Sequence, residues 1–199
     1  MKTKIKISVV LGIVLGLFAF KSIESKRIIV IDAAHGGSDF GATLAGTQEK
    51  IIVEFIAKKI KSQNSNDNLE IVLLREGDQF MELGERVSTI NKLNPNLVIS
   101  LHINSSKDSN KNGAEAYISS NTKFYDQSKI SAEKVLEKIT TENLSKGKVS
   151  EANFFILKKS NCPAVSLEIG YLSNEKDRKY VSSEKGQNEI AAKILEAIK

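Results

Sequence analysis

The stretch VIDAAHGGSDFGA, Val30 to Ala42, contains one of only two histidines in the 199-residue chain. The β-branched run that precedes His35 is typical of a strand buried on both faces of a sheet. Two glycines follow the histidine, and they leave room for a ligand beside its ring. The stretch therefore indicates either a metal or catalytic site at the end of a strand or, more simply, a turn that happens to hold a histidine.

Strand and helix signals alternate along the chain. Apolar residues at helical spacing predict helices at 47–62, 83–93, 126–141 and the C-terminus. Thr47 is the expected N-cap of the first helix, and the apolar positions include Ile51, Phe55, Leu83 and Ile130. Apolar runs predict strands at 27–33, 69–75, 96–106, 113–119, 153–157 and 164–170. This alternation predicts an α/β fold: a three-layer single domain over residues 27–199, with a mostly parallel central sheet of about six strands flanked by helices.

The first twenty residues differ from the rest. MKTKIK carries three lysines, and an uncharged apolar run of 14 residues, Ile7 to Phe20, follows it. A basic start and a short apolar run are typical of a signal peptide, because a spanning helix usually needs about 20 apolar residues. Residues 1–20 are therefore expected to be a signal peptide or an uncleaved N-terminal anchor, and the protein to be exported to the periplasm or cell envelope. Membrane contact is expected only through this segment, if it is retained.

The charge of the chain gives little support for a nucleic-acid partner. Residues 1–20 hold three lysines and no acid, so without them the net charge falls from +5 to +2. No dense Lys/Arg stripe interleaved with aromatic residues occurs, and no nucleic-acid partner is expected. The single cysteine, Cys162, cannot form an internal disulfide and is expected to be a buried small residue.

Four polar residues occupy comparable places relative to the predicted elements. They are His35 after the first strand, Glu49 at the start of the first helix, His102 at the end of the third strand and Glu168 near the end of the last. Ligands gather outside the carboxyl ends of parallel strands, so this fold would bring all four to one edge. Glu168 is the hardest to explain structurally, since a carboxylate in the apolar run AVSLEIGYL costs several kcal/mol to desolvate unless it is paired.

Two imidazoles and one carboxylate form the ligand set of many catalytic zinc sites. A second carboxylate that binds no metal can act as the general base. The intervals between the four residues, 14, 53 and 66 positions, match no short linear zinc motif. Taken singly, each residue also has a structural alternative, such as loop hydrogen bonding for the histidines and a favourable helix dipole for Glu49. A zinc site therefore depends on the fold bringing distant strands together.

Six blocks of the chain occur in the order seen in one enzyme family. They extend from about Arg27 to the C-terminus and read IVIDAAHGGSDFGA, QEKIIVEFIAKKI, VLLREGDQFMELGERVSTIN, LVISLHINSS, GAEAYI and SLEIGYLSN. In these blocks the chain resembles the zinc-dependent N-acetylmuramoyl-L-alanine amidases of the third amidase class, which are bacterial cell-wall hydrolases. Two departures are visible: Ala33 and Ala34 replace the usual proline and glycine before His35, and Tyr171 stands where phenylalanine is common.

This resemblance implies a reaction and a role for each residue. It implies one Zn²⁺ held by His35, Glu49 and His102, with Glu168 as the catalytic carboxylate. The implied reaction is hydrolysis of the amide between N-acetylmuramic acid and L-alanine in peptidoglycan. Peptidoglycan is then the expected partner, and an activator protein is left open as a second. Two alternatives stay open: a zinc peptidase that cuts within the stem peptide, and a non-catalytic peptidoglycan-binding protein.

The family-like blocks also hold four further polar residues, namely Arg75, Asp78, Arg86 and Asn104. For this group, structural pairing or loop hydrogen bonding is favoured over contact with a substrate. Asn104, two residues beyond His102, would point to the same side of a continuing strand. Asn104 is therefore the residue of this group most expected to line the site, with Arg75 as a second substrate-binding candidate.

Overall fold

The computed structural model describes residues 26–199, built on a six-stranded sheet with the order β4-β1-β5-β8-β6-β7. The strands are β1 (Arg27–Ala33), β4 (Leu69–Leu73), β5 (Leu97–Asn104), β6 (Ala114–Ile118), β7 (Lys146–Glu151) and β8 (Ala164–Tyr171). All neighbours pair in parallel except β6 and β8, which are antiparallel. A small hairpin outside the sheet consists of β2 (Thr43–Leu44) and β3 (Thr47–Gln48). The mostly parallel sheet confirms the predicted fold class.

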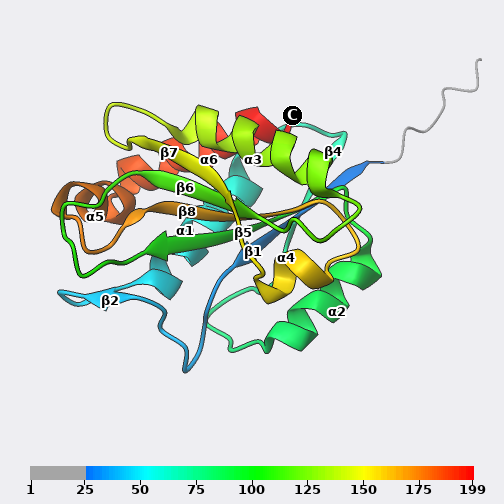
Figure 1. Ribbon diagram of the computed structural model, residues 1–199, viewed down its shortest axis with the longest axis horizontal. Coiled ribbons are helices and arrows are strands. Elements are labelled where there is room, and N and C mark those ends of the chain that lie inside the picture. The colour runs from blue at the N-terminus through cyan, green and yellow to red at the C-terminus, as the bar shows by residue number, and fades with distance from the viewer. Residues whose placement is uncertain (1–25) are drawn as a thin grey trace, which may run out of the picture.

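Helices cover both faces of the sheet, as Figure 1 shows. One layer contains α1 (Glu49–Gln63), α3 (Tyr125–Ile139) and α6 (Glu184–Ile198), and the other contains α2 (Leu83–Leu93) and α4 (Phe155–Lys159). A further helix, α5 (Glu175–Ser182), packs against α6 and β8. Alternation along the strands separates two cores: Ile29 and Ile31 of β1 join the core of the α1 layer, whereas Val30 joins the core that contains Ile90 of α2.

The predicted export segment, residues 1–20, lies outside the described residues. None of the helices between residues 26 and 199 combines the length and hydrophobicity that a bilayer-spanning segment needs. The assignment of residues 1–20 as a signal peptide or anchor therefore stays a prediction from their composition.

The prediction of the fifth strand was wrong. The run NFFIL predicts a strand at 153–157, but residues Phe155–Lys159 form helix α4. A short apolar run does not by itself distinguish a strand from a buried helical turn, and here Ile156 and Leu157 pack into the core beneath α2. The sixth strand is instead β7, whose sequence KGKVSE is polar and largely exposed. No apolar pattern marks an edge strand of this kind.

The start of α1 also differs from the prediction. Thr47 belongs to β3, and Gln48 occupies the N-cap position without a side-chain hydrogen bond to the helix. The amide of Glu49 donates to the carbonyl oxygen of Ala42 at 2.9 Å, so the hairpin before the helix satisfies its first N–H group. The predicted cap was therefore wrong, because a neighbouring backbone group takes the place of a capping side chain.

Four apolar residues at helical spacing are exposed rather than buried, namely Ile51, Phe55, Leu83 and Ile130. In α1, the residues that face the sheet are Ile52, Val53, Ile56, Ala57 and Ile60. Only one stripe of a surface helix can contact the core, so an apolar residue on either side of that stripe stays in solvent. In the C-terminal helix, by contrast, every predicted apolar position is buried, as shown by Ile190, Ala191, Ile194, Leu195 and Ile198.

These burial differences predict different effects for two matched isoleucine substitutions. Ile99→Ala removes a fully buried side chain from the central strand β5 and should lower the free energy of unfolding by about 2–5 kcal/mol. Ile130 on α3 is 65% exposed, so Ile130→Ala should change the same quantity by less than about 0.5 kcal/mol. Urea denaturation measures both values, and equal losses would contradict the core described above.

Candidate metal centre and catalytic carboxylate

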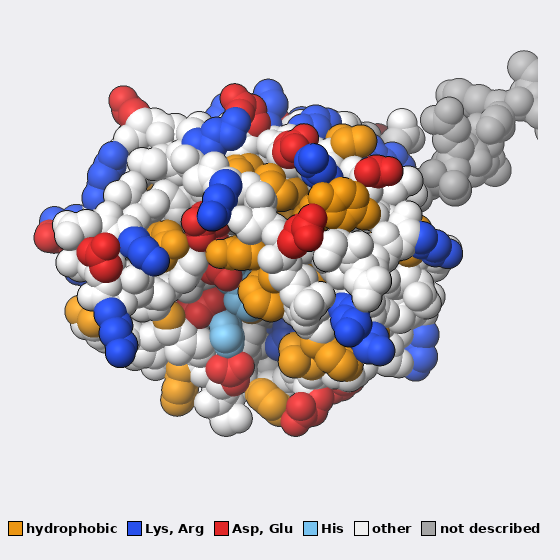
Figure 2. Space-filling view, in the orientation of Figure 1, with side chains coloured by type: hydrophobic (Ala, Val, Ile, Leu, Met, Phe, Trp, Pro, Cys, Tyr) orange, Lys and Arg blue, Asp and Glu red, His pale blue; other side chains and the backbone are white. Residues whose placement is uncertain are grey.

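Two histidines and one glutamate meet at the carboxyl ends of β1 and β5. One ligand atom from each of His35, Glu49 and His102 lies within 4.8 Å of the other two. Glu49 Oε1 is 3.0 Å from His35 Nε2 and 3.2 Å from His102 Nδ1. The three residues come from the loop after β1, the first turn of α1 and the end of β5. Figure 2 shows the histidines in a hollow bordered by acidic and hydrophobic side chains.

Backbone geometry explains the glycines around His35. His35 itself has a φ of 61°, in the left-handed region, and Gly36 continues the turn with a φ of 122°. A Cβ at Gly36 would lie 2.2 Å from the backbone oxygen of Gln79, so this glycine lets the loop pack against the segment before α2. The room beside the ring comes from Gly41, where a Cβ would approach His35 Nε2 to 2.8 Å and Glu49 Oε2 to 2.5 Å.

The Glu49 carboxylate is buried and fixed by the backbone. Its Oε2 accepts a hydrogen bond from the Ala42 amide at 2.8 Å, and its Oε1 accepts one from the Ile103 amide at 3.0 Å. Burial acts to raise the pKa of Glu49, but the hydrogen bonds and charges of His102 and His35 outweigh it and hold the pKa well below its usual range. Glu49 is therefore a fixed negative charge at the centre of the site.

The same charge acts on the two imidazoles. Burial alone would lower the pKa of His35, but hydrogen bonds and charges from Glu49 and Asp39 raise it to about 9. Burial also opposes the charged form of His102, whose pKa is nevertheless raised by Glu49 and Glu168. A cluster that attracts protons this strongly attracts a divalent cation for the same electrostatic reason, and the cation would displace one proton from each imidazolium ring.

Each histidine is oriented through its other ring nitrogen. His35 Nδ1 lies 2.8 Å from Asp39 Oδ2, and His102 Nε2 lies 3.2 Å from Ser100 Oγ. The Ser100 hydroxyl donates to Asp32 Oδ2 at 2.7 Å, so its oxygen is left to accept a hydrogen bond from His102 Nε2–H. This pattern assigns the tautomers and leaves His35 Nε2 and His102 Nδ1 free to bind a metal.

Arg86 of α2 joins this network to the loop after β1. Its guanidinium forms a buried ion pair with Asp32 and donates to the carbonyl oxygens of Ala33 at 3.1 Å and His35 at 2.6 Å. Removing one partner of a buried ion pair usually costs about 3–5 kcal/mol, because the other charge is left uncompensated. Arg86 is thus a positioning residue, in agreement with the structural pairing expected for it.

Arg75 supports the other side of the loop. All of its N–H donors are engaged within the protein, by the carbonyl oxygens of Ala33, Ala34, Lys50 and Gly77 and by the carboxylate of Glu54. The residue is also buried. In this structure Arg75 holds the loop after β1. Its contact with a substrate, which would require one of these bonds to break, stays a prediction.

The register of β5 changes at Asn104. The pairing of β5 with β8 shifts between His102 and Asn104, which interrupts the regular alternation on which the predicted orientation depends. The side-chain oxygen of Asn104 accepts a hydrogen bond from the Ser105 amide at 2.8 Å, and its backbone oxygen accepts one from the Leu172 amide at 2.7 Å. Asn104 therefore braces the turn that leaves β5, and its contact with a substrate stays a prediction.

Glu168 lies next to His102 in the sheet. The two are paired residues of the parallel strands β5 and β8, so their side chains project from the same face. Glu168 is half-buried. Burial raises its pKa to about 7, with the charges of Glu49 and Glu115 adding to the shift and those of His102 and His35 opposing it. A carboxyl group with a pKa near neutrality, adjacent to side chains that could hold a metal, has the properties of an acid–base catalyst.

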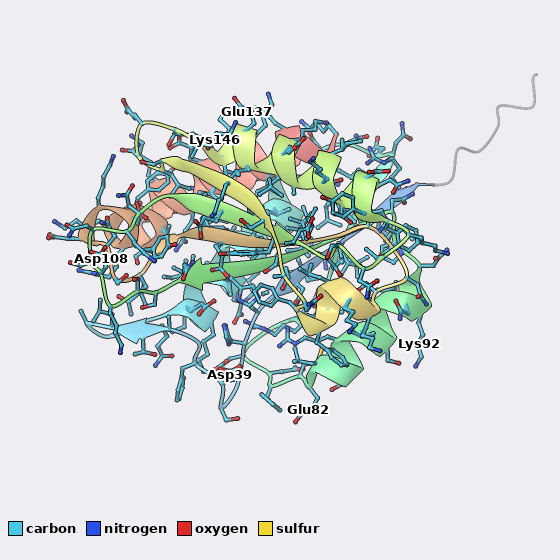
Figure 3. All side chains as sticks on the ribbon, in the orientation of Figure 1. Asp39, Glu82, Lys92, Asp108, Glu137 and Lys146 are labelled. Carbon is cyan, nitrogen blue, oxygen red and sulfur yellow. The ribbon has the colours of Figure 1, made fainter. Side chains whose placement is uncertain are left out.

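A cavity of about 350 Å³ opens beside the cluster. His35, His102 and Arg86 contribute its polar lining, and its apolar lining comes from Phe80, Met81, Leu83 and Ile156. Asp39 and Glu82 complete one side, and Figure 3 shows both along the same edge of the molecule. A larger hollow of about 830 Å³ lies between α3 and β7, and no histidine lines it. The smaller cavity is therefore the one that can hold a ligand against the cluster.

Comparison with known proteins places these residues in an enzyme family. Residues 29–199 match the family model described as Amidase_3, N-acetylmuramoyl-L-alanine amidase. The chain belongs to this family. The resemblance stated from the sequence blocks is thereby confirmed, and the enzyme class of the protein is N-acetylmuramoyl-L-alanine amidase.

Relatives and solved structures match this amidase over most of its length. A putative N-acetylmuramoyl-L-alanine amidase of Buchnera aphidicola is 32% identical, over 86% of this chain and 94% of its own. The catalytic domain of the amidase CwlV from Bacillus (Paenibacillus) polymyxa var. colistinus is 35% identical, with a TM-score of 0.79 over 86% of this chain and 96% of that one. The CwlD amidase from Clostridioides difficile, solved with the GerS lipoprotein, is 27% identical, with a TM-score of 0.78 over 87% and 96%.

The residues of the amidase that orient the rings of His35 and His102 were not predicted from the sequence. Ser100 lies two positions before His102 on the same strand, so alternation alone could have placed both side chains on one face. Asp39 lies four residues after His35, and this spacing predicts contact between the two side chains only if the conformation of the intervening turn is known. Asp32 offered a third signal, as a charged residue inside an apolar strand that needs a buried partner.

Asp39→Ala in the amidase should weaken zinc binding roughly 10–100-fold, because it removes the acceptor that orients the His35 ring. Asp108→Ala is the matched control, since it removes an exposed carboxylate from the loop after β5 (Figure 3) and should leave the affinity unchanged. Competition with a chromophoric chelator measures both dissociation constants. Equal affinities in the two variants would show that Asp39 does not support the metal centre.

Proposed function

We propose that this amidase uses zinc to hydrolyse the amide that joins the lactyl group of N-acetylmuramic acid to L-alanine in peptidoglycan. The observation that carries the proposal is the cluster of His35, Glu49 and His102, with Glu168 paired to His102 on the neighbouring strand. The cluster supports the metal requirement, and family membership supports cell-wall amide hydrolysis as the class of reaction.

The donor atoms of the cluster fit zinc better than a hard cation. Two imidazole nitrogens and one carboxylate oxygen are typical of a catalytic zinc site, whereas Mg²⁺ and Ca²⁺ prefer oxygen ligands. His35 Nε2, His102 Nδ1 and a Glu49 carboxylate oxygen would hold the ion. When bound, zinc supplies a Lewis acid that polarises a carbonyl group and makes water acidic enough to react near neutral pH.

Glu168 carries the proton transfers in this proposal. Its carboxylate takes a proton from the attacking water and later delivers it to the departing amine of L-alanine. A pKa of about 7 suits both steps, because the group can then accept and release a proton near neutral pH. Glu49 cannot share this role, since its two oxygens are engaged by backbone amides and imidazoles.

Two other functions differ from this one in their products. A zinc peptidase that cuts within the stem peptide would leave alanine attached to muramic acid. A non-catalytic peptidoglycan-binding protein would release nothing. The presence of three metal-binding side chains and an adjacent carboxyl group favours an enzyme. Only a muramoyl amidase releases a stem peptide with a free N-terminal L-alanine.

The proposed substrate also defines where the protein acts. Peptidoglycan lies outside the cytoplasmic membrane, so residues 1–20 are proposed as the export signal or anchor. A protein partner is part of the proposal as well, because the similar CwlD amidase was solved in complex with the GerS lipoprotein.

Glu168→Gln should lower kcat by roughly 10²–10⁴-fold and leave the zinc content unchanged, because it removes the proton carrier and no metal ligand. His102→Ala should lose both zinc and activity. Glu70→Gln, at an exposed position of β4, is the matched control and should keep both. Mass spectrometry of the products released from peptidoglycan gives the rates, and atomic absorption gives the zinc content. Full activity of Glu168→Gln, or a metallated and active His102→Ala, would contradict the assigned roles.

Removal of the metal should stop the reaction. Treatment of the purified protein with a zinc chelator should abolish the release of stem peptides with N-terminal L-alanine, and added zinc should restore it. Undiminished release by protein that is shown to be free of metal would refute the zinc requirement, while leaving the identity of the cleaved bond intact.

A further inference from the structure

A second carboxylate lies beyond Glu168 on the same face of the sheet. Glu168 pairs with His102 of β5 on one side and with Glu115 of β6 on the other. Directly paired residues project from the same face, and neighbouring strands lie about 4.8 Å apart. The three side chains therefore form a row in the order His102, Glu168, Glu115. The mechanism proposed above uses the first two and gives Glu115 no task.

Glu115 is held in place by two phenols. The hydroxyl groups of Tyr117 and Tyr171 each donate to Glu115 Oε2 at 3.1 Å. Burial, together with the nearby charge and hydrogen bond of Glu115, raises the pKa of both tyrosines to about 12, so both stay neutral donors near neutral pH. The hydroxyl of Tyr171, which replaces a common phenylalanine, thus has a defined partner in this chain.

The other oxygen of Glu115 is left for a ligand. Within residues 26–199, side-chain hydrogen bonds reach Glu115 only at Oε2. In the same part of the chain, no lysine, arginine or histidine forms an ion pair with this carboxylate. A half-buried carboxylate with a fixed orientation and an unpaired charge is suited to bind a cationic N–H donor.

We propose that Glu115 binds the amino end of the stem peptide and recognises the leaving L-alanine, an inference that rests on the function proposed above. In that hydrolysis the C–N bond breaks, the oxygen of water joins the lactyl carbonyl, and both hydrogens of water end on the nitrogen. The products are a carboxylate and an ammonium group. The ammonium group forms beside Glu168, which delivers the proton, and the next carboxylate along the row is Glu115.

The order of the row sets the direction of the substrate. With the scissile carbonyl at the metal-binding side chains and its nitrogen at Glu168, the peptide continues over β6 toward Glu115. Tyr117 packs there against Phe154, with ring centroids 5.4 Å apart, and Phe154 is 45% exposed. The peptide side of the site therefore combines a carboxylate with an apolar wall. The sugar side occupies the cavity that Arg86 lines, next to β1 and α2.

Peptide inhibition of the zinc-loaded enzyme tests this assignment. Two stem tripeptides are compared, one with a free N-terminal L-alanine and one that is N-acetylated, so that they differ in the ammonium charge. Glu115→Gln should raise the inhibition constant of the free-amine peptide roughly tenfold or more, and leave that of the acetylated peptide within about twofold. Glu151→Gln is the matched control, because Glu151 also accepts a hydrogen bond from a tyrosine, Tyr125, at 3.0 Å, but lies on the edge strand β7. It should change neither constant.

Two results would overturn the role of Glu115. One is an unchanged inhibition constant of the free-amine peptide in folded Glu115→Gln. The other is an equal rise of the inhibition constants of both peptides, which a purely structural role of Glu115 would give. If Glu115→Gln does not fold, Tyr117→Phe takes its place, because it removes one of the two hydrogen bonds that fix the carboxylate. Tyr117→Phe should raise the inhibition constant of the free-amine peptide alone, by roughly threefold. Equal inhibition constants in Tyr117→Phe and the wild type, or an equal rise for both peptides, would overturn the role as well.

The wild-type protein is assayed in parallel for release of stem peptides with N-terminal L-alanine. No release by the wild type refutes the proposed function. Release by the wild type, combined with unchanged constants in Glu115→Gln, refutes only the role of Glu115. The two failures are therefore distinguishable in one set of measurements.

Discussion

Asp32 and Arg86 form a buried ion pair between β1 and α2, and both the backbone position of His35 and the ring orientation of His102 depend on it. The Asp32 carboxylate accepts a hydrogen bond from the Ser100 hydroxyl, which in turn orients the ring of His102. The Arg86 guanidinium donates to the carbonyl oxygen of His35 at the turn where that residue leaves the strand. An apolar pair of similar volume could pack between the same elements, but it would supply neither set of hydrogen bonds.

Strand register supplies the second constraint on the site. Leu101 and Leu167 lie in the core on the side of α1, α3 and α6, while the residues that follow them, His102 and Glu168, project from the opposite face as a matched pair. A slip of one residue in β8 would exchange Glu168 for an apolar neighbour. The apolar core that fixes the register therefore also fixes the Glu168 carboxyl group relative to the three side chains that could hold a metal.

The parts of the site that follow local patterns could be predicted from the sequence. His35 and His102 end β-branched runs, and Glu168 interrupts an apolar one, so alternating strands and helices were enough to place them at one edge. The bulge at Asn104 could not be foreseen, because it arises from pairing with β8, a strand 60 residues away in the chain. The place of Glu115 beside Glu168 was not predicted for a similar reason. It depends on β6 lying next to β8, and the order of strands in a sheet cannot be derived from a single sequence.

The antiparallel pairing of β6 has a consequence for how such an enzyme can diversify. Strands β1, β5 and β8 bring their carboxyl ends to the catalytic edge, but β6 brings its amino end. The segment that borders the proposed peptide side is therefore the loop before β6, residues 105–113, and it contains none of the three residues that could hold a metal. In the binding mode proposed above, insertions or deletions in this loop would alter which peptides are accepted without moving His35, Glu49 or His102. The proposed binding mode thus assigns substrate range and bond cleavage to different segments of the same sheet.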